Sequence, residues 1–140
     1  LDAILTNTCM QCNQKNIQWT CMAEGQILDF MDALDMYIML GNALDNAVEN
    51  LETIADPECR FLVVNIWKKG ALAFIKIENY CEKQVEFLNG IPQTTKEDVQ
   101  EHGFGSRSIR DIVEKYHGEL KISLSLNIFA VNIMMPANIT

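Results

Sequence analysis

The amino-acid sequence predicts a two-layer α/β sandwich, with helices on one face of a mixed, mostly antiparallel sheet. The first observation is the order of periodic segments along the chain: helix, strand, helix, two strands, helix and two strands. The second is that both pairs of consecutive strands are joined by turn residues, Lys68-Lys69-Gly70 and Asn127, as in β-hairpins. The third is the length of 140 residues, which suits one domain with one hydrophobic core.

The N-terminal half supplies a helix, a strand and the longest helix. Residues 1–14 place apolar side chains at helical spacing. Residues 17–23 alternate as in a strand, with Ile17, Trp19 and Cys21 directed inward. We expect Asp32 to cap a long helix over residues 33–54, which ends before Pro57.

The C-terminal half supplies two hairpins with a helix between them. Strands are expected over residues 60–67 and 71–79, and again over residues 119–126 and 128–135. A helix is expected over residues 106–116, with Gly118 as its C-terminal stop. Residues 80–102 fit no element, and so long a loop in a compact domain is uncommon unless it is functional or disordered. We expect this loop to be a lid beside a ligand site.

The long helix carries polar side chains along one line. Asn42, Asn46 and Glu49 lie at i, i+4 and i+7, with Asp45 beside them. The opposite line is typical of a core face and consists of Met36, Leu40, Leu44, Ala47 and Leu51. Asn is at best a middling helix former, so helix propensity does not explain two of them on one line. A carboxamide oxygen binds a hard cation without adding negative charge, which suits a nucleotide that arrives with magnesium.

A second motif, residues 102–107 (His-Gly-Phe-Gly-Ser-Arg), opens the last helix. The two glycines let the backbone approach a ligand, and the free N–H groups of the first helical turn favour an anion. Gly-x-Gly before a helix is often only turn geometry. The carboxamide line and the adjoining loop, from which Lys96 can fold over a phosphate, favour a ligand site instead.

These motifs resemble the GHKL ATP-binding superfamily, which includes gyrase, the mismatch-repair protein MutL, heat-shock chaperones and histidine kinases. Residues 42–49 resemble its N box, residues 102–105 its second glycine box and residues 129–136 its final strand. The resemblance covers nearly the whole chain, taken as the single domain 1–140, and implies the Bergerat ATP-binding fold with residues 80–102 as the ATP lid. Leu-Gly-Asn-x-Leu-Asp-Asn-Ala, Thr-Thr-Lys-x-Asp and His-Gly-x-Gly most resemble sensor histidine kinases of the peptide-pheromone receptor branch in Gram-positive bacteria.

One motif of the superfamily is absent. Most relatives carry Asp-x-Gly-x-Gly after the first hairpin, where the Asp binds the adenine amino group. Here the strand ends Ile-Glu-Asn-Tyr-Cys over residues 77–81. The peptide-pheromone receptor branch is similar in having Asn at this point, so Asn79 aligns with the adenine-binding residue. Its oxygen accepts a hydrogen bond more weakly than a carboxylate does.

The resemblance implies a role for each site residue. Asn46 would bind Mg2+, with Asn42 assisting directly or through water, and Glu49 would orient the metal shell or remain an ordinary surface carboxylate. The residues expected around the phosphates and the lid are Lys96, His102, Gly103, Phe104, Gly105 and Arg107. Lys96 would steady the β- and γ-phosphates as a point charge. For Lys96 and Arg107, a purely solvated side chain is the alternative.

The resemblance also implies phosphoryl transfer from ATP with Mg2+. ATP-hydrolysing relatives carry a Glu four residues before the metal-binding Asn, where it activates water, but this chain has Asn42 there. We therefore expect slow hydrolysis and transfer to a protein histidine instead. Neither His102 nor His117 lies in a suitable long helix. The acceptor is expected on a separate dimerisation helix hairpin of the same kinase, with a response regulator downstream.

The composition of the chain limits its possible ligands and its cellular location. A net charge of −8 argues against nucleic acid as a ligand. No apolar run approaches the ~20 residues that span a bilayer, so a membrane would be reached only through a missing N-terminal part. The start, Leu1-Asp2-Ala3, reads as a cut inside a longer gene, which fits a cytoplasmic domain of a receptor kinase. The five scattered cysteines fit reduced thiols, and the lone Cys9-x-x-Cys12 lacks companions for a zinc site.

Two other functions stay open on the same fold. A nucleotide-free docking module would keep the architecture and have lost ATP binding through the altered adenine box. An anti-sigma-type serine kinase of the same superfamily would act on a separate protein. Binding of ATP or ADP distinguishes the first alternative, and gene context upstream of residue 1 distinguishes the second.

Overall fold

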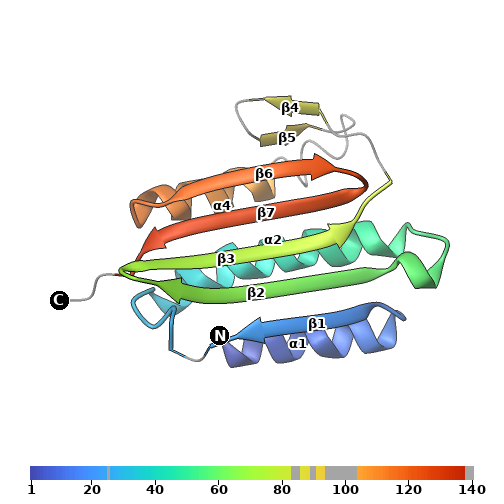
Figure 1. Ribbon diagram of the computed structural model, residues 1–140, viewed down its shortest axis with the longest axis horizontal. Coiled ribbons are helices and arrows are strands. Elements are labelled where there is room, and N and C mark those ends of the chain that lie inside the picture. Colours follow the sequence, from blue (N-terminus) through green and yellow to red (C-terminus); the bar gives the residue numbers. More distant parts are fainter. Residues whose placement is uncertain (25, 83–85, 89–90, 94–103, 138–140) are drawn as a thin grey trace.

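The computed structural model describes residues 1–24, 26–82, 86–88, 91–93 and 104–137, and only the backbone of residues 86–88, 91–93 and 104–106. Three helices, α1 (Asp2–Gln14), α2 (Ala33–Glu52) and α4 (Phe104–Lys115), cover one face of a sheet (Figure 1). The sheet contains β1 (Gln18–Ala23), β2 (Phe61–Lys69), β3 (Leu72–Tyr80), β6 (Glu119–Ser125) and β7 (Ile128–Pro136). Its order is β1-β2-β3-β7-β6, with β1 parallel to β2 and the other pairs antiparallel. The predicted two-layer α/β sandwich is therefore confirmed.

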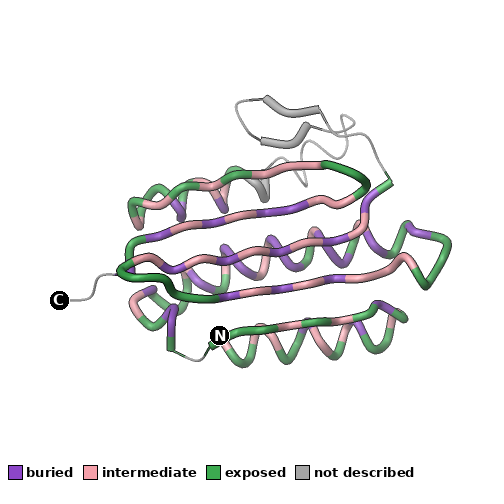
Figure 2. The backbone as a smooth tube through the Cα atoms, viewed as in Figure 1, coloured by how far each residue is buried: buried purple, intermediate pink, exposed green. Residues whose placement is uncertain are grey.

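The core lies between α2 and the central strands of the sheet. All five residues of the predicted apolar line of α2 are buried, and Leu40 and Leu51 have no exposed surface (Figure 2). They face alternate residues of β2 and β3, among which Val64, Ile75 and Ile77 are at most 1% exposed. Full burial of one such side chain contributes about 1.5–3 kcal/mol. The apolar line thus determines which side of α2 faces the sheet.

The opposite face of the sheet carries no helix among the described residues. Trp67 lies there, 37% exposed, with its ring stacked on Phe74 at a centroid distance of 5.2 Å. A tryptophan inside a strand, as expected here for residues 60–67, is usually a core residue, but Trp67 lies outside the core. Strand alternation separates two faces but does not say which of them a helix covers.

None of the helices in the described ranges is long and apolar enough to cross a membrane.

The end of α4 differs in detail from the prediction. His117, not Gly118, has the left-handed conformation, with φ of 60°. The Gly118 N–H donates to the Val113 carbonyl at 2.9 Å, which completes a Schellman-type ending. A Cβ at Gly118 would lie 2.4 Å from the carbonyl oxygen of Met134. Gly118 is needed for this close approach rather than for its φ angle.

The predicted lid lies largely outside the described residues. Within residues 80–102 the backbone forms a short antiparallel hairpin, β4 (Glu86–Leu88) and β5 (Ile91–Gln93). The expectation that this segment contains no regular element is therefore wrong for these two strands. Its role as a lid stays a prediction.

A polar cluster joins the N-terminus of α2 to the C-terminus of α4, which lie next to each other. The Asp35 carboxylate accepts hydrogen bonds from Lys115 Nζ and Tyr116 Oη, each at 2.7 Å. Tyr116 Oη in turn accepts a hydrogen bond from the Asp32 backbone N–H at 2.9 Å. Asp32 occupies the N-cap position as predicted, but its side chain makes no capping hydrogen bond. The cluster fixes the C-terminus of α4 against the N-terminus of α2.

The cluster predicts an acid-sensitive contribution to stability. Hydrogen bonds from Lys115 and Tyr116 lower the pKa of the Asp35 carboxyl. The resulting stabilisation is complete above the ordinary Asp range, near pH ~4, and is lost as the pH falls through the lowered pKa. Asp35→Asn should therefore unfold at a lower temperature than wild type at neutral pH, and the gap should close in acid. Thermal unfolding across a pH series tests this, with exposed Asp29→Asn as the control; a gap independent of pH would contradict it.

The β6–β7 turn predicts a stabilising substitution. Leu126 and Asn127 both have positive φ, 53° and 64°, as in a type I′ turn, and Leu126 is 93% exposed. The left-handed conformation costs a residue such as Leu about 1–2 kcal/mol. Leu126→Asn should raise the free energy of unfolding in urea by about 1 kcal/mol, because Asn tolerates this conformation better than Leu and Asn127 keeps its side-chain hydrogen bond to Tyr80. Leu126→Ala keeps the Cβ strain and should give no such gain.

Candidate functional site

The polar line of α2 faces the side on which α4 lies. Asn42 and Asn46 are half-buried and Glu49 is exposed. Asp35, which contacts α4, precedes Asn42 by seven residues, or two helical turns, and so lies on the same line. The sequence-predicted residues of α2 therefore lie along the α4 side of the helix, away from the sheet.

The two helices run in opposite directions, which brings the start of α4 beside the middle of α2 (Figure 1). Lys115 of α4 contacts Asp35 of α2. Eight residues back along α4, about 12 Å at 1.5 Å per residue, is Arg107. The same length along α2 from Asp35 ends at Ala43, between Asn42 and Asn46. Arg107 is exposed in the first turn of α4. By helix rise alone, its backbone is at the height of the two carboxamides.

The charges near this line are acidic. Partial burial, followed by the nearby Glu49 carboxylate, raises the pKa of Asp45, while Lys15 opposes the shift. Lys15 forms an ion pair with Glu52 near the end of α2. In the described part of the chain, no three His, Cys, Asp or Glu side chains group closely enough to hold a metal ion. The chemistry of Asn42 and Asn46 instead fits a hard cation whose countercharge comes with a bound polyanion.

The candidate adenine residue lies at the end of β3. Asn79 is 2% exposed, on the helix-covered face of the sheet. Its Nδ2 donates to the Tyr80 carbonyl at 3.0 Å, and Asn50 Nδ2 of α2 donates to the same oxygen at 3.4 Å. With its nitrogen engaged, Asn79 has its side-chain oxygen to offer to a ligand. The two carboxamides join the C-terminal half of α2 to the strand end where the predicted lid begins.

Asn50 was not expected from the sequence as part of the site. It follows Asn46 by four residues, so Asn42, Asn46 and Asn50 form a run at i, i+4 and i+8. That spacing could have indicated Asn50 from the sequence. Its hydrogen-bond partner could not be predicted, because the Tyr80 carbonyl lies 30 residues away and belongs to the backbone.

The structure describes several of the predicted site residues incompletely or not at all. Lys96, His102 and Gly103 lie outside the described residues. Phe104 and Gly105 open α4, two residues earlier than predicted, with only their backbone described. Of the predicted site residues, the structure describes the side chains of Asn42, Asn46, Glu49, Arg107 and Asn79. That they form one site, and how they relate to the lid, stays a prediction.

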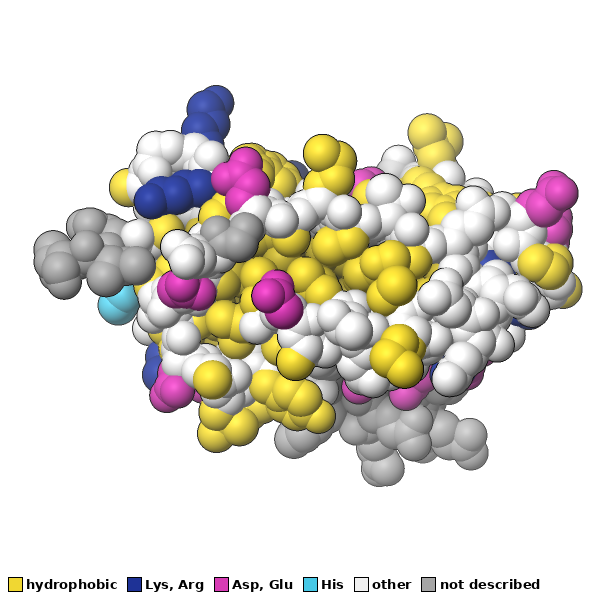
Figure 3. All heavy atoms as spheres, turned by 90° about the horizontal axis from the view of Figure 1, so that it is seen from below, with side chains coloured by type: hydrophobic (Ala, Val, Ile, Leu, Met, Phe, Trp, Pro, Cys, Tyr) yellow, Lys and Arg dark blue, Asp and Glu magenta, His cyan; other side chains and the backbone are white. Residues whose placement is uncertain are grey.

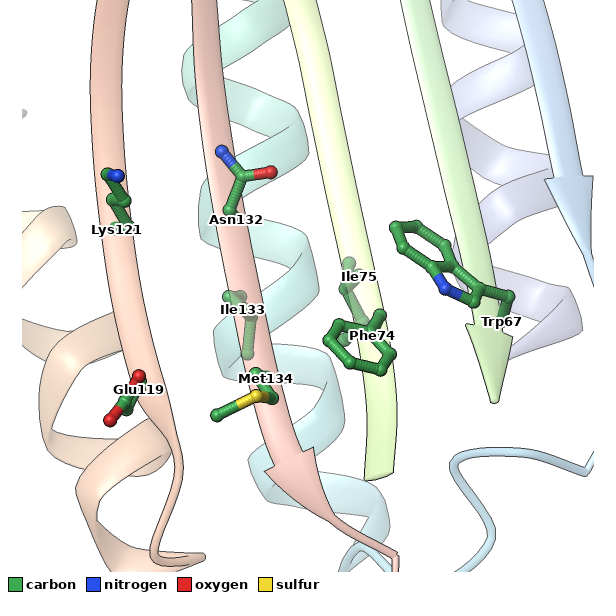
Figure 4. A pocket seen from close by; sticks show the side chains of 8 residues that line it. All are labelled: Trp67, Phe74, Ile75, Glu119, Lys121, Asn132, Ile133 and Met134. Carbon is green, nitrogen blue, oxygen red and sulfur yellow. The ribbon is translucent and has the colours of Figure 1, made fainter. Parts of the chain in front are cut away.

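A separate depression lies on the open face of the sheet. Its volume is about 260 Å³, and Trp67, Phe74, Lys121 and Asn132 are among the residues that line it (Figure 4). The strands separate this depression from α2, which runs behind them in the same view. It contains none of the predicted site residues, so we do not assign it to nucleotide binding.

Comparison with known proteins agrees with this architecture. The family model described as "GHKL domain" matches residues 31–136. The mycobacterial sensor histidine kinase MprB superposes with a TM-score of 0.62 and 14% identity, over 96% of this chain and 94% of that one. The catalytic domain of histidine kinase ThkA gives 0.66 and 14%, over 98% and 92%.

A third structure is longer than this chain. The histidine kinase domain of a blue-light activated kinase from Erythrobacter litoralis EL346 gives a TM-score of 0.64 and 17% identity, over 95% of this chain and 59% of that one. No curated protein sequence matches. The family match covers most of the chain, and the structural matches share its fold. The chain belongs to the GHKL domain family, and its fold is that of histidine kinase catalytic domains.

Proposed function

We propose that this domain binds Mg-ATP and donates the γ-phosphoryl group to a histidine on a separate helix-hairpin domain in two-component signalling. The proposal is based on the position of the first turn of α4, which lies at the same height along α2 as the carboxamides of Asn42 and Asn46. A cation-binding line and an anion-favouring helix N-terminus then flank the same space. A metal-bound triphosphate needs both.

In this proposal, Asn46 binds the magnesium ion and Asn42 assists it, while Glu49 orients the metal shell. Arg107 reaches the phosphates, and the backbone at Gly103 and Gly105 approaches them closely. Lys96, His102 and Phe104 belong to the lid. Bound Mg-ATP supplies the phosphoryl group and a cation that neutralises charge as the group is transferred. The protein's own contribution is positioning and electrostatics, which these residues supply without a general base.

The adenine end uses a carboxamide in place of a carboxylate. Asn79 is held by its bond to the Tyr80 carbonyl, and its oxygen would accept from the adenine amino group. A neutral acceptor forms a weaker bond than a charged one, so modest affinity is expected. This residue, with Asn42 in place of Glu, supports assignment to the peptide-pheromone receptor branch of sensor kinases.

The proposal extends to partners outside this chain. The phosphoacceptor histidine would lie on a dimerisation hairpin of the same kinase, and a response regulator would receive the group from it. The domain would be the cytoplasmic part of a membrane-bound receptor. The isolated domain should then bind nucleotide and turn it over slowly.

Removing the proposed metal ligand should weaken nucleotide binding. Asn46→Ala is expected to lower the affinity for Mg-ATP by about tenfold or more, because a ligand to the cation is lost. Calorimetric titration of wild type and variant measures this, and omission of Mg2+ should weaken wild-type binding as well. Asn13→Ala is the matched control, an exposed Asn on α1.

The outcomes separate the competing functions. Equal binding by wild type and Asn46→Ala would overturn the assignment of Asn46 alone. A wild-type protein that is folded but gives no heat with either ATP or ADP would instead favour a nucleotide-free docking module.

Restoring the superfamily's carboxylate at position 79 should destabilise this domain. Asn79→Asp removes the donor to the Tyr80 carbonyl and leaves a charge beside that oxygen at a site 2% exposed. A loss of about 1–3 kcal/mol in the free energy of unfolding is expected in urea. Asn50→Asp loses the weaker bond to the same carbonyl from a half-buried position and should cost less. Equal midpoints for Asn79→Asp and wild type would contradict this account.

A further inference from the structure

Strand β1 leaves one row of backbone groups unpaired within the described sheet. It is an edge strand, parallel to β2. Gln18 N–H donates to the Arg60 carbonyl at 2.8 Å and Glu24 N–H to the Ile66 carbonyl at 3.4 Å. Alternate residues of a parallel strand point their N–H and C=O groups to the same side. The groups of Trp19, Cys21 and Ala23 therefore point outward from the sheet.

The β1 edge lacks the usual protection against another strand. Natural edge strands carry charged residues, proline or a bulge. The sequence of β1, Gln-Trp-Thr-Cys-Met-Ala, has neither a charge nor a proline, and its register with β2 is continuous. The opposite edge, β6, exposes Glu119 and Lys121. The two edges of one sheet thus differ in their protection.

The surface around β1 is poor in charge as well. The whole chain has 11 basic and 19 acidic residues among 140, yet residues 3–23 contain only Lys15, which pairs with Glu52. Met10 on α1 is 56% exposed and Met22 on β1 is 70% exposed. Figure 3 views the molecule from this edge and shows hydrophobic side chains across the centre, with acidic side chains among them and the basic ones toward the margin. Depletion of charge with enrichment in Met is typical of the core of a protein interface.

From this geometry we infer that β1 pairs antiparallel with β1 of a second copy, joining two five-stranded sheets into one sheet of ten strands. A two-fold axis through Cys21 makes this the residue that exchanges both backbone hydrogen bonds with its own copy. The outward groups of Trp19 then meet those of Ala23 of the other copy. On the open face, Thr20 lies opposite Met22.

A second copy fits this edge better than an unrelated extended segment. The register sets the large Trp19 against the small Ala23 and brings no like charges together, although the molecule carries a net charge of −8. Two-fold pairing also sets α1, whose one charged residue is Asp2 at its start, next to α1 of the other copy. The proposed nucleotide residues stay free, because α4 packs at β6, the opposite edge. The inference therefore does not depend on the proposed function.

Sedimentation equilibrium of the whole chain tests the pairing. Thr20→Lys combined with Met22→Lys places like charges opposite each other twice, and the dimer dissociation constant should rise by about tenfold or more. Thr20→Lys combined with Met22→Glu places opposite charges there and should restore association to near the wild-type level. Ser125→Lys on β6 is the control and should change nothing. Both β1 positions are exposed, so circular dichroism should show all variants folded.

A thiol crosslinker tests the register. In a Cys9→Ser background, which removes the neighbouring thiol of α1, a short bifunctional reagent should link two copies, and Cys21→Ser should abolish the link. Cys59→Ser, at another half-buried cysteine, should not abolish it. A wild-type protein that is monomeric at all concentrations would overturn the inference. So would a dimer that responds equally to both charge designs, or one that still crosslinks without Cys9 and Cys21.

Discussion

The packing of one apolar line of α2 against the central strands is the contact on which the rest of the molecule depends. Met36, Leu40, Leu44 and Leu51 are all buried against the sheet. Once these side chains are buried, the rotation of the helix is determined. The line with Asn42, Asn46 and Glu49 must then lie away from the sheet. The polar line therefore owes its position to burial on the opposite side of the same helix.

Two polar contacts hold neighbouring elements beside the polar line of α2. Asp35 holds the end of α4, and because the helices are antiparallel, the start of α4 comes level with the carboxamides. At the other end, Asn50 and Asn79 share the Tyr80 carbonyl. The first contact sets the phosphate side of the proposed site and the second the adenine side. A substitution of Asp35 or Asn50, neither of which is proposed to contact the nucleotide, should thus still affect the site.

A single layer of helices has consequences for the rest of the surface. The uncovered sheet face retains apolar side chains such as Trp67, which find cover by stacking on one another. The edge at β1 keeps unpaired backbone groups in a surface of low charge. Exposed strand edges and apolar faces are liabilities unless another chain or a charge covers them. One edge of this sheet carries charges and the other does not, and that asymmetry is the basis of the proposed pairing of two copies.

All α-helices and strands except β4 and β5, the core line of α2 and the motifs of the GHKL family could be recognised from the sequence, because they depend on local spacing. Asn42, Asn46 and Asn79 could be named in this way. Three features depend on distant partners and could not be recognised from the sequence: Tyr116 against Asp35, Asn50 against the Tyr80 carbonyl, and the sheet face that leaves Trp67 exposed. Periodicity reports which residues share a face. It carries no information on which element, 30 or 80 residues away, will lie against that face.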